Sequence, residues 1–129
     1  MRIGEVAAAT GTTTKTLRFY EDAGLLPAAE RTVAGYRRYD PGVVERLHFI
    51  RRGQGAGLTL AQIRTILQIR DAGHAPCAHV EKLLADRLDE IDRQLAELRE
   101  LRATVAVLHR AAAEPVPDAC APETICRYL

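Results

Sequence analysis

The chain has 129 residues, of which 47% are hydrophobic and only 5% aromatic, and its formal net charge at pH 7 is +1. This length predicts one small globular unit, or one domain with an extension, whose core would be small without a partner chain. No run approaches the roughly 18 apolar residues of a membrane span and the signal-peptide layout is absent, so we expect a cytoplasmic protein without membrane association.

Charge is distributed unevenly along the chain. Residues 1–64 contain ten Lys or Arg and six Asp or Glu, a balance of +4, whereas residues 65–129 contain eight and eleven, a balance of −3. The net charge therefore understates the positive field of the first half.

The first predicted elements are two short helices joined by a tight turn. An apolar stripe that begins at Ile3 predicts a helix that ends near Gly11, where a helix C-terminus favours glycine. The hydroxyl of Thr12 or Thr13 can cap the second helix. Leu17 is expected to lie on the inward face of that helix. This arrangement is a helix-turn-helix.

Cations mark the outward face of the second helix. Lys15 and Arg18 are three residues apart and project together, so they can enter a DNA major groove side by side. For an isolated pair of cations, a solvated helix face would be the simpler interpretation. The following loop favours DNA, because Arg31 and the segment 35–39 interleave cations with tyrosine hydroxyls, as suits a wing on the sugar-phosphate backbone. Gly35 is expected to supply a positive φ for the turn of this loop.

A second helical pair follows. Asp40 and Pro41 predict a helix start, with Pro at the first helical position, and an apolar stripe runs to about Arg52. Three glycines between residues 53 and 57 are expected to loosen the chain. Thr59 is the predicted cap of the next helix, which ends near residues 71 to 73.

A long amphipathic helix is predicted after this pair. Its apolar residues recur at spacings of three and four over about four heptads, which indicates a coiled coil. At 1.5 Å per residue the helix would be roughly 45 Å long, and a bare apolar seam of that length invites association. We therefore expect a homodimer. The seam consists of Leu84, Leu88, Ile91, Leu95, Leu98, Leu101 or Arg102, Val105 and Leu108.

The sequence resembles the MerR family of bacterial transcription regulators through about residue 70. The resemblance lies in the segments Ile3–Val6, Leu17–Glu21, Gly24–Leu26, Gly35–Tyr39 and Gly57–Ile63. It implies a winged helix-turn-helix, with Arg18 as the best candidate for reading a base. The candidate DNA-binding residues are Thr14, Lys15, Arg18, Tyr20, Arg31, Tyr36, Arg37 and Tyr39.

The resemblance also implies how the dimer would work. In MerR-like proteins the long helix pairs antiparallel with that of its mate and sets the separation of the DNA-binding domains, so the operator should be palindromic. The liganded form distorts an over-long promoter spacer so that RNA polymerase engages both promoter elements. The expected partners are therefore promoter DNA, RNA polymerase and a second copy of the chain.

Three cysteines are candidates for the signal-sensing site, and their odd number argues against a secreted disulfide framework. In an antiparallel dimer, Cys77 of one subunit would meet Cys120 and Cys126 of its mate. Thiolates select soft or borderline cations such as zinc, cadmium, mercury, lead or copper(I). By resemblance to the metal-responsive branch, a Cys at the helix start accompanies divalent-ion sensing, whereas copper(I) sensors usually have Ser there. A fourth ligand can come from His79, His109, Asp118 or His74.

One departure from the family bears on the metal. Divalent sensors commonly place a Cys at the end of the dimer helix, where this chain has alanines at 111–113, so Cys120 must replace that ligand. Oxidation of the same thiols is the alternative signal, which would make the chain a redox switch without a bound metal. Three cysteines are too few for an iron-sulfur cluster held by four. No phosphate loop, metal-hydrolase motif or nucleophile elbow is present, so no enzymatic activity is expected.

The sequence thus predicts a mainly α-helical fold. Its expected parts are a winged helix-turn-helix DNA-binding domain with the second helical pair at residues 1–72, a linker at 73–79, an antiparallel coiled-coil helix at 80–112, and a metal-binding loop and tail at 113–129.

Overall fold

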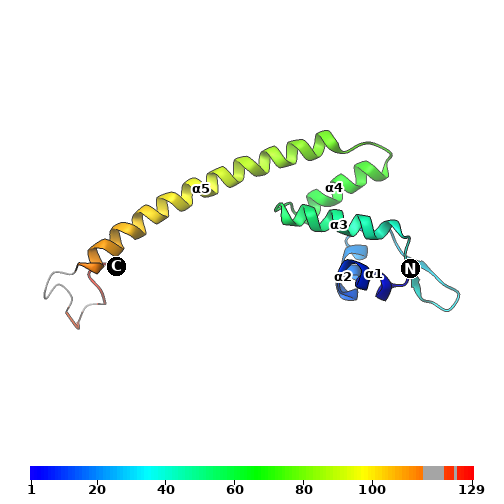
Figure 1. The fold of residues 1–129 in the computed structure, drawn as a ribbon, viewed down its shortest axis with the longest axis horizontal. Helices are drawn as coiled ribbons and strands as arrows, with labels where there is room; N and C mark the ends of the chain where they lie inside the picture. Colours follow the sequence, from blue (N-terminus) through cyan, green and yellow to red (C-terminus); the bar gives the residue numbers. More distant parts are fainter. Residues whose placement is uncertain (115–120, 124) are drawn as a thin grey trace. The chain divides into compact units, whose positions relative to one another are not determined.

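A computed structural model describes residues 1–114, 121–123 and 125–129 of the chain. Its described part is mainly helical, which confirms the predicted fold class. Residues 1–87 and residues 88–129 form two compact units. The elements are α1 (Ile3–Thr10), α2 (Thr14–Asp22), β1 (Glu30–Arg31), β2 (Arg37–Arg38), α3 (Gly42–Gly55), α4 (Leu60–Asp71) and α5 (Cys77–Ala113) (Figure 1).

The helix-turn-helix forms where the sequence predicts it. Gly11 ends α1 in the left-handed conformation, with φ of 66°, which a residue without a side chain adopts at little cost. Thr13 caps α2, because its Oγ1 accepts a hydrogen bond of 3.2 Å from the backbone N–H of Thr16. Val6 of α1 and Leu17 of α2 are fully buried and join the two helices.

A short antiparallel hairpin follows α2. In it, Glu30 pairs with Arg38 and Arg31 pairs with Arg37. Gly35 turns the loop between the strands with φ of 84°, as predicted. The pairing aligns the cations of both strands at the base of the wing.

The second helical pair differs from the prediction in its boundaries. Pro41 is the N-cap of α3 and not its first residue, and α3 continues to Gly55 instead of ending near Arg52. The reason is a close approach of two helices: a Cβ on Gly53 would lie 2.9 Å from Cδ1 of Ile63, so this glycine allows α4 to pack against α3. At the start of α4, Thr59 and Gln62 cap each other's backbone N–H groups with bonds of 2.9 and 3.1 Å, as predicted for Thr59.

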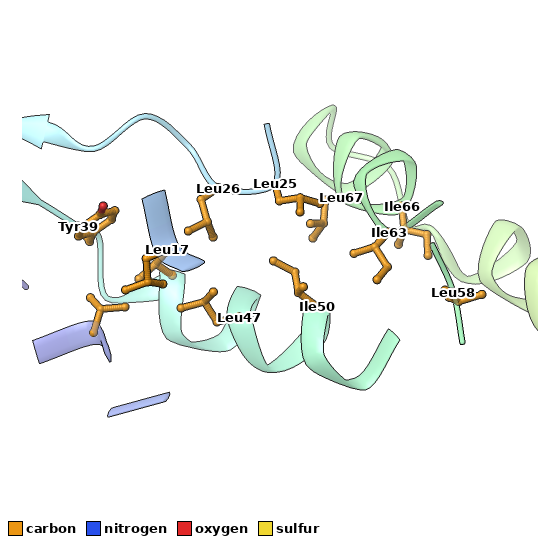
Figure 2. Packing of buried hydrophobic residues seen from close by; sticks show 12 residues of the cluster. Leu17, Leu25, Leu26, Tyr39, Leu47, Ile50, Leu58, Ile63, Ile66 and Leu67 are labelled. Atoms are coloured by element: carbon orange, nitrogen blue, oxygen red, sulfur yellow. The ribbon is translucent and has the colours of Figure 1, made fainter. Parts of the chain in front are cut away.

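The hydrophobic core lies entirely within the first unit. Tyr39, Leu17, Leu26 and Leu47 gather at one end of the cluster, and the isoleucines of α3 and α4 lie toward the other (Figure 2). Val80 and Leu83, near the start of α5, pack against the same cluster. The buried members are Val6, Leu17, Leu25, Leu26, Tyr39, Val43, Leu47, Ile50, Leu58, Ile63, Ile66 and Leu67.

One buried arginine ties three segments of this unit together. Arg46 of α3 is only 8% exposed, and its Nε donates a hydrogen bond of 2.6 Å to the carbonyl oxygen of Leu25. Its two Nη atoms donate to the two carboxylate oxygens of Asp71 at 2.8 and 2.9 Å. These hydrogen bonds lower the pKa of the Asp71 carboxyl. The end of α4 is thereby fixed to α3 and to the turn after α2.

The long helix α5 begins at Cys77, three residues before the predicted start, so part of the predicted linker at 73–79 is helical. Pro76 precedes this helix, where the missing N–H of a proline costs no hydrogen bond, and its carbonyl oxygen accepts a bond of 2.9 Å from the backbone N–H of Val80. None of the 37 residues of α5 is buried. Among the described helices, none combines the length and apolar character that crossing a membrane requires.

Candidate nucleic-acid interface and metal centre

Helix α2 presents four exposed residues on one stripe: Lys15, Arg18, Phe19 and Asp22. The spacing of three and four residues keeps them on one face, opposite the fully buried Leu17. The predicted pair of cations therefore projects from the recognition face of the helix-turn-helix. Thr14, which precedes the pair, is half-buried at the first turn.

The wing loop is held by bonds among its own residues. The N–H of Thr32 donates to the carbonyl oxygen of Tyr36 at 2.8 Å, and Arg31 Nη1 donates to the carbonyl oxygen of Gly35 at 3.2 Å. The Tyr36 ring is 61% exposed, with the guanidinium of Arg2 at 5.5 Å from its centroid. Arg2 was not among the predicted site residues, since no sequence spacing links it to a residue 34 positions away.

The recognition helix and the wing share one hollow of about 380 Å³. Its lining combines the guanidinium groups of three arginines with the exposed Tyr36. Three cations around one depression attract a polyanion, and a phosphate oxygen can accept bonds from several of them. The lining residues are Ile3, Arg18, Arg31, Gly35, Tyr36 and Arg37.

Glu21, on the side of α2 toward the wing, fixes the wing to the helix. Its Oε1 accepts a bond of 3.1 Å from the N–H of Ala29, and its Oε2 accepts one of 2.9 Å from the hydroxyl of Tyr39. The same Oε2 lies 3.8 Å from Nε of Arg37. Arg37 thus keeps its place in the hollow through an ion pair at the base of the wing.

Tyr39 is the predicted site residue that the structure buries. It was expected to touch DNA, but it is 3% exposed and its ring belongs to the core. Burial raises the pKa of its hydroxyl, and the bond to Glu21 adds to the shift. Tyr39 therefore positions the wing, and a sequence pattern of alternating Arg and Tyr could not show that this tyrosine points inward.

Helix α3 supports the recognition helix from behind. The hydroxyl of Tyr20 donates a bond of 3.2 Å to Oε1 of Gln54. Arg51 Nη2 lies 3.4 Å from the carbonyl oxygen of Gly11, at the turn of the helix-turn-helix. Tyr20 is half-buried, so only part of its surface is accessible for the predicted contact with DNA.

The predicted metal ligands are only partly described. Cys77, the first residue of α5, and Cys126 in the tail are both exposed free thiols. Cys120 and Asp118 lie outside the described residues. His79 is half-buried, and His74 and His109 are exposed. Among the described residues of one chain, no group of three His, Cys, Asp or Glu side chains is arranged to hold a metal ion.

Comparisons with known proteins agree with this arrangement. Residues 1–69 match the family model described as MerR HTH family regulatory protein, and residues 44–108 match the model described as MerR, DNA binding. The mercuric resistance operon regulatory protein of Bacillus cereus is 39% identical over 100 residues, which cover 78% of this chain and 76% of the relative. A probable heavy metal-dependent transcriptional regulator of Haemophilus influenzae is 37% identical over 101 residues, covering 78% and 79%.

A solved structure is similar over nearly the whole chain. It is the transcription regulator PbrR691 from Ralstonia metallidurans CH34 in complex with lead(II), with a TM-score of 0.77 and 34% sequence identity. The similarity covers 97% of this chain and 91% of that chain.

Proposed function

Since the chain belongs to the MerR family of helix-turn-helix regulators, we propose that it is a dimeric transcriptional regulator whose signal is a soft metal ion. Members of this family are regulatory proteins with a helix-turn-helix, so the chain is a DNA-binding regulator of transcription and not an enzyme. The observation that carries the proposal is that one chain combines a cationic face on α2 and the wing with a long helix that has no buried residue and an exposed thiol at its start.

The DNA contact would be made by α2 and the wing together. Lys15 and Arg18 would enter the major groove, with Arg18 donating bidentately to a guanine edge. Arg31 and Tyr36 would lie on the backbone, where phosphate contacts fix the register of the protein. Thr14, Tyr20 and Arg37 complete the candidate set, and Arg37 lines the same hollow as Arg18, Arg31 and Tyr36.

The dimer would form along α5. Its apolar seam is exposed in the single chain, with Leu88 at 62% and Leu98 at 61%, and a second copy is the natural cover. An antiparallel pair of these helices has twofold symmetry, so the operator would be a palindrome with one half-site for each DNA-binding unit.

The sensor site would need both subunits. Cys77 of one chain with Cys120 and Cys126 of its mate would supply three thiolates, and His79, His109 or Asp118 would supply a fourth ligand. Thiolates are soft donors, so the exposed thiols of Cys77 and Cys126 suit zinc, cadmium, lead or mercury. The relatives' mercuric resistance and heavy metal dependence, and the lead(II) in the similar structure, support this class of ion.

Activation would follow from unequal binding by two states of the dimer. The thiols must bind the ion more tightly in a DNA-distorting state than in a repressing state, since a ligand shifts an equilibrium only by its differential affinity. The distorted promoter would then present both of its elements to RNA polymerase.

A competition titration tests the sensor site. The reduced, metal-free protein is titrated with zinc, cadmium, mercury, lead and copper(I), following thiolate-to-metal absorption in the wild type and in Cys77→Ser and Cys126→Ser. Tight binding of one divalent ion that collapses in both variants is the expected result. Weak, unselective binding indifferent to Cys77 would support thiol oxidation as the signal, and selective binding of copper(I) would make the chain a copper sensor.

A promoter assay separates sensing from DNA binding. Cys120→Ser should keep operator affinity and lose metal-dependent induction. Arg18→Ala should lose specific binding by roughly tenfold or more while it retains the metal site. Equal loss of DNA binding in both variants would contradict the division of roles.

A further inference from the structure

Phe19 lies on the recognition face of α2 and is 54% exposed. Other aromatic side chains nearby are engaged differently: Phe49 and Tyr20 pack against the core, and Tyr39 is part of it. A single exposed apolar side chain is common on protein surfaces and means little by itself. Its position on this helix is what requires an explanation.

Phe19 follows Lys15 by four residues, so it lies one turn after Lys15 on the same exposed face, with Arg18 on the other side of Lys15. A DNA groove that receives Lys15 therefore also meets the phenyl ring beside it. The ring is supported from one side by Tyr20, with centroids 5.9 Å apart and planes inclined by 51°. Tyr20 is in turn bonded to Gln54 of α3, so the support of the ring is fixed.

The major groove contains one apolar group that such a ring can contact, the 5-methyl group of thymine. We propose that Phe19 is a specificity-determining residue that contacts a thymine methyl group in each half-site of the operator. This inference rests on the proposed DNA-binding role of α2. Along the helix axis Phe19 lies about 6 Å from Lys15, so the thymine should be within about two base pairs of the contacts made by the cations.

Substitution of deoxyuridine for thymidine tests the proposal, because it removes only the 5-methyl group. The probe is a duplex selected by the full-length dimer from a library of random sequence, with each thymine then replaced in turn. At one thymine in each half-site, the wild type should bind the deoxyuridine duplex about fourfold more weakly, as expected for one lost apolar methyl contact. Phe19→Ala should bind the two duplexes equally.

Two matched variants serve as controls. Lys15→Ala should weaken binding to both duplexes and keep the fourfold ratio, because it removes a cation and not the ring. Val107→Ala shortens another exposed apolar side chain, on α5 and outside the DNA-binding unit, and should keep the ratio and the affinity. Thermal unfolding followed by circular dichroism establishes that Phe19→Ala is folded, as its exposure predicts.

A second measurement uses the same thymine position. With 5-iodouracil there, irradiation should cross-link the wild-type protein through the peptide that contains Phe19, and the yield should fall in Phe19→Ala. Cross-linking through a different peptide would assign the methyl contact to another residue and overturn the proposal.

The outcomes separate this inference from the function on which it rests. If no duplex is selected, or if binding is indifferent to Lys15 and Arg18, the proposed recognition role of α2 fails and this inference fails with it. If a duplex is bound through both cations but no thymine methyl group matters, only the role of Phe19 is overturned. Methyl sensitivity that persists in Phe19→Ala has the same meaning.

Discussion

Residues 1–87 and residues 88–129 differ in where their apolar side chains lie. The first region buries twelve hydrophobic residues in one cluster, whereas no residue of α5 is buried and its leucines from Leu88 to Leu101 remain about half exposed. A helix without tertiary packing is only marginally stable in water. The first region therefore carries its own core, whereas the described residues of the second have none within the single chain.

The side-chain hydrogen bonds of the two regions differ in the same way. In the first region, Arg46 and Glu21 join segments 8 to 25 residues apart. In the second region, Thr104 and Arg110 donate to carbonyl oxygens four residues earlier in the same helix. Bonds of the first kind connect different elements, whereas bonds of the second kind stay within one helix.

The largest expected effect is on dimerisation, and two valines of α5 test it. Val105 lies in the predicted seam, and Val107 lies on the opposite face of the helix, outside the seam. In the single chain the two side chains are similarly exposed, at 53% and 57%. Val105→Glu should raise the dimer Kd at least about 100-fold, because a buried apolar contact is lost from both copies and charges are buried. Val107→Glu should change it little. Sedimentation equilibrium measures both, and equal effects would place the seam elsewhere on α5.

The next effect should be confined to the first region. Arg46→Ala leaves the Leu25 carbonyl and the Asp71 carboxylate without this guanidinium, and should lower the free energy of unfolding by about 3 kcal/mol. Arg52→Ala, at an exposed position of the same helix, should cost less than about 0.5 kcal/mol. Urea unfolding measures the difference. If Arg46→Ala instead weakened dimerisation at unchanged stability, the two regions would not be separable.

Local signals in the sequence predicted much of the first region. Gly11, Thr13 and Thr59 act through neighbours one turn away, so their caps could be read from the sequence. The end of α3 was predicted wrongly because glycines usually break helices, whereas Gly53 serves contact with Ile63 on another helix. Such a contact is set by tertiary packing, which no short spacing encodes.

The candidate site was predictable in its exposed part. Lys15 and Arg18 share one face of α2 because of helix periodicity alone. The inward position of Tyr39 depends on a partner, Glu21, that lies 18 residues earlier, and the place of Arg2 beside Tyr36 depends on the fold of the wing. The predicted thiol site spans two chains, so its assembly stays a prediction.

A smaller effect tests the junction where the first region ends. Gly57 has φ of 83°, and a Cβ there would lie 2.6 Å from Nε of Arg87, which bonds to the carbonyl oxygen of Ala56 at 3.2 Å. Gly35 has a similar φ of 84° and no atom within 4 Å of such a Cβ. Gly35→Ala should cost about 1 kcal/mol from the backbone alone. Gly57→Ala should cost about 1 kcal/mol more, because Arg87 must move and its bond is lost.

A double variant makes this comparison specific. In an Arg87→Ala background, the clash at Gly57 is absent, so Gly57→Ala should cost only what Gly35→Ala costs. Urea unfolding of the four proteins gives the coupling between the two residues. Strict additivity would mean that Arg87 does not hold α5 to the turn between α3 and α4.

The smallest expected effect is the pH dependence that Asp71 gives to the first region. The Arg46 hydrogen bonds hold the pKa of this carboxyl below its ordinary value of 3.8, so the folded state favours the ionised form. The resulting stabilisation is present above pH 3.8 and is lost as the pH falls through the lowered pKa. Because the side chain is 52% exposed, solvent limits the contribution to less than about 1 kcal/mol. The difference in unfolding free energy between the wild type and Asp71→Asn should therefore shrink in acid. In an Arg46→Met background, where only the weaker Coulombic effect of Arg70 lowers this pKa, that difference should depend much less on pH. An undiminished pH dependence there would assign the shift to a group other than Arg46.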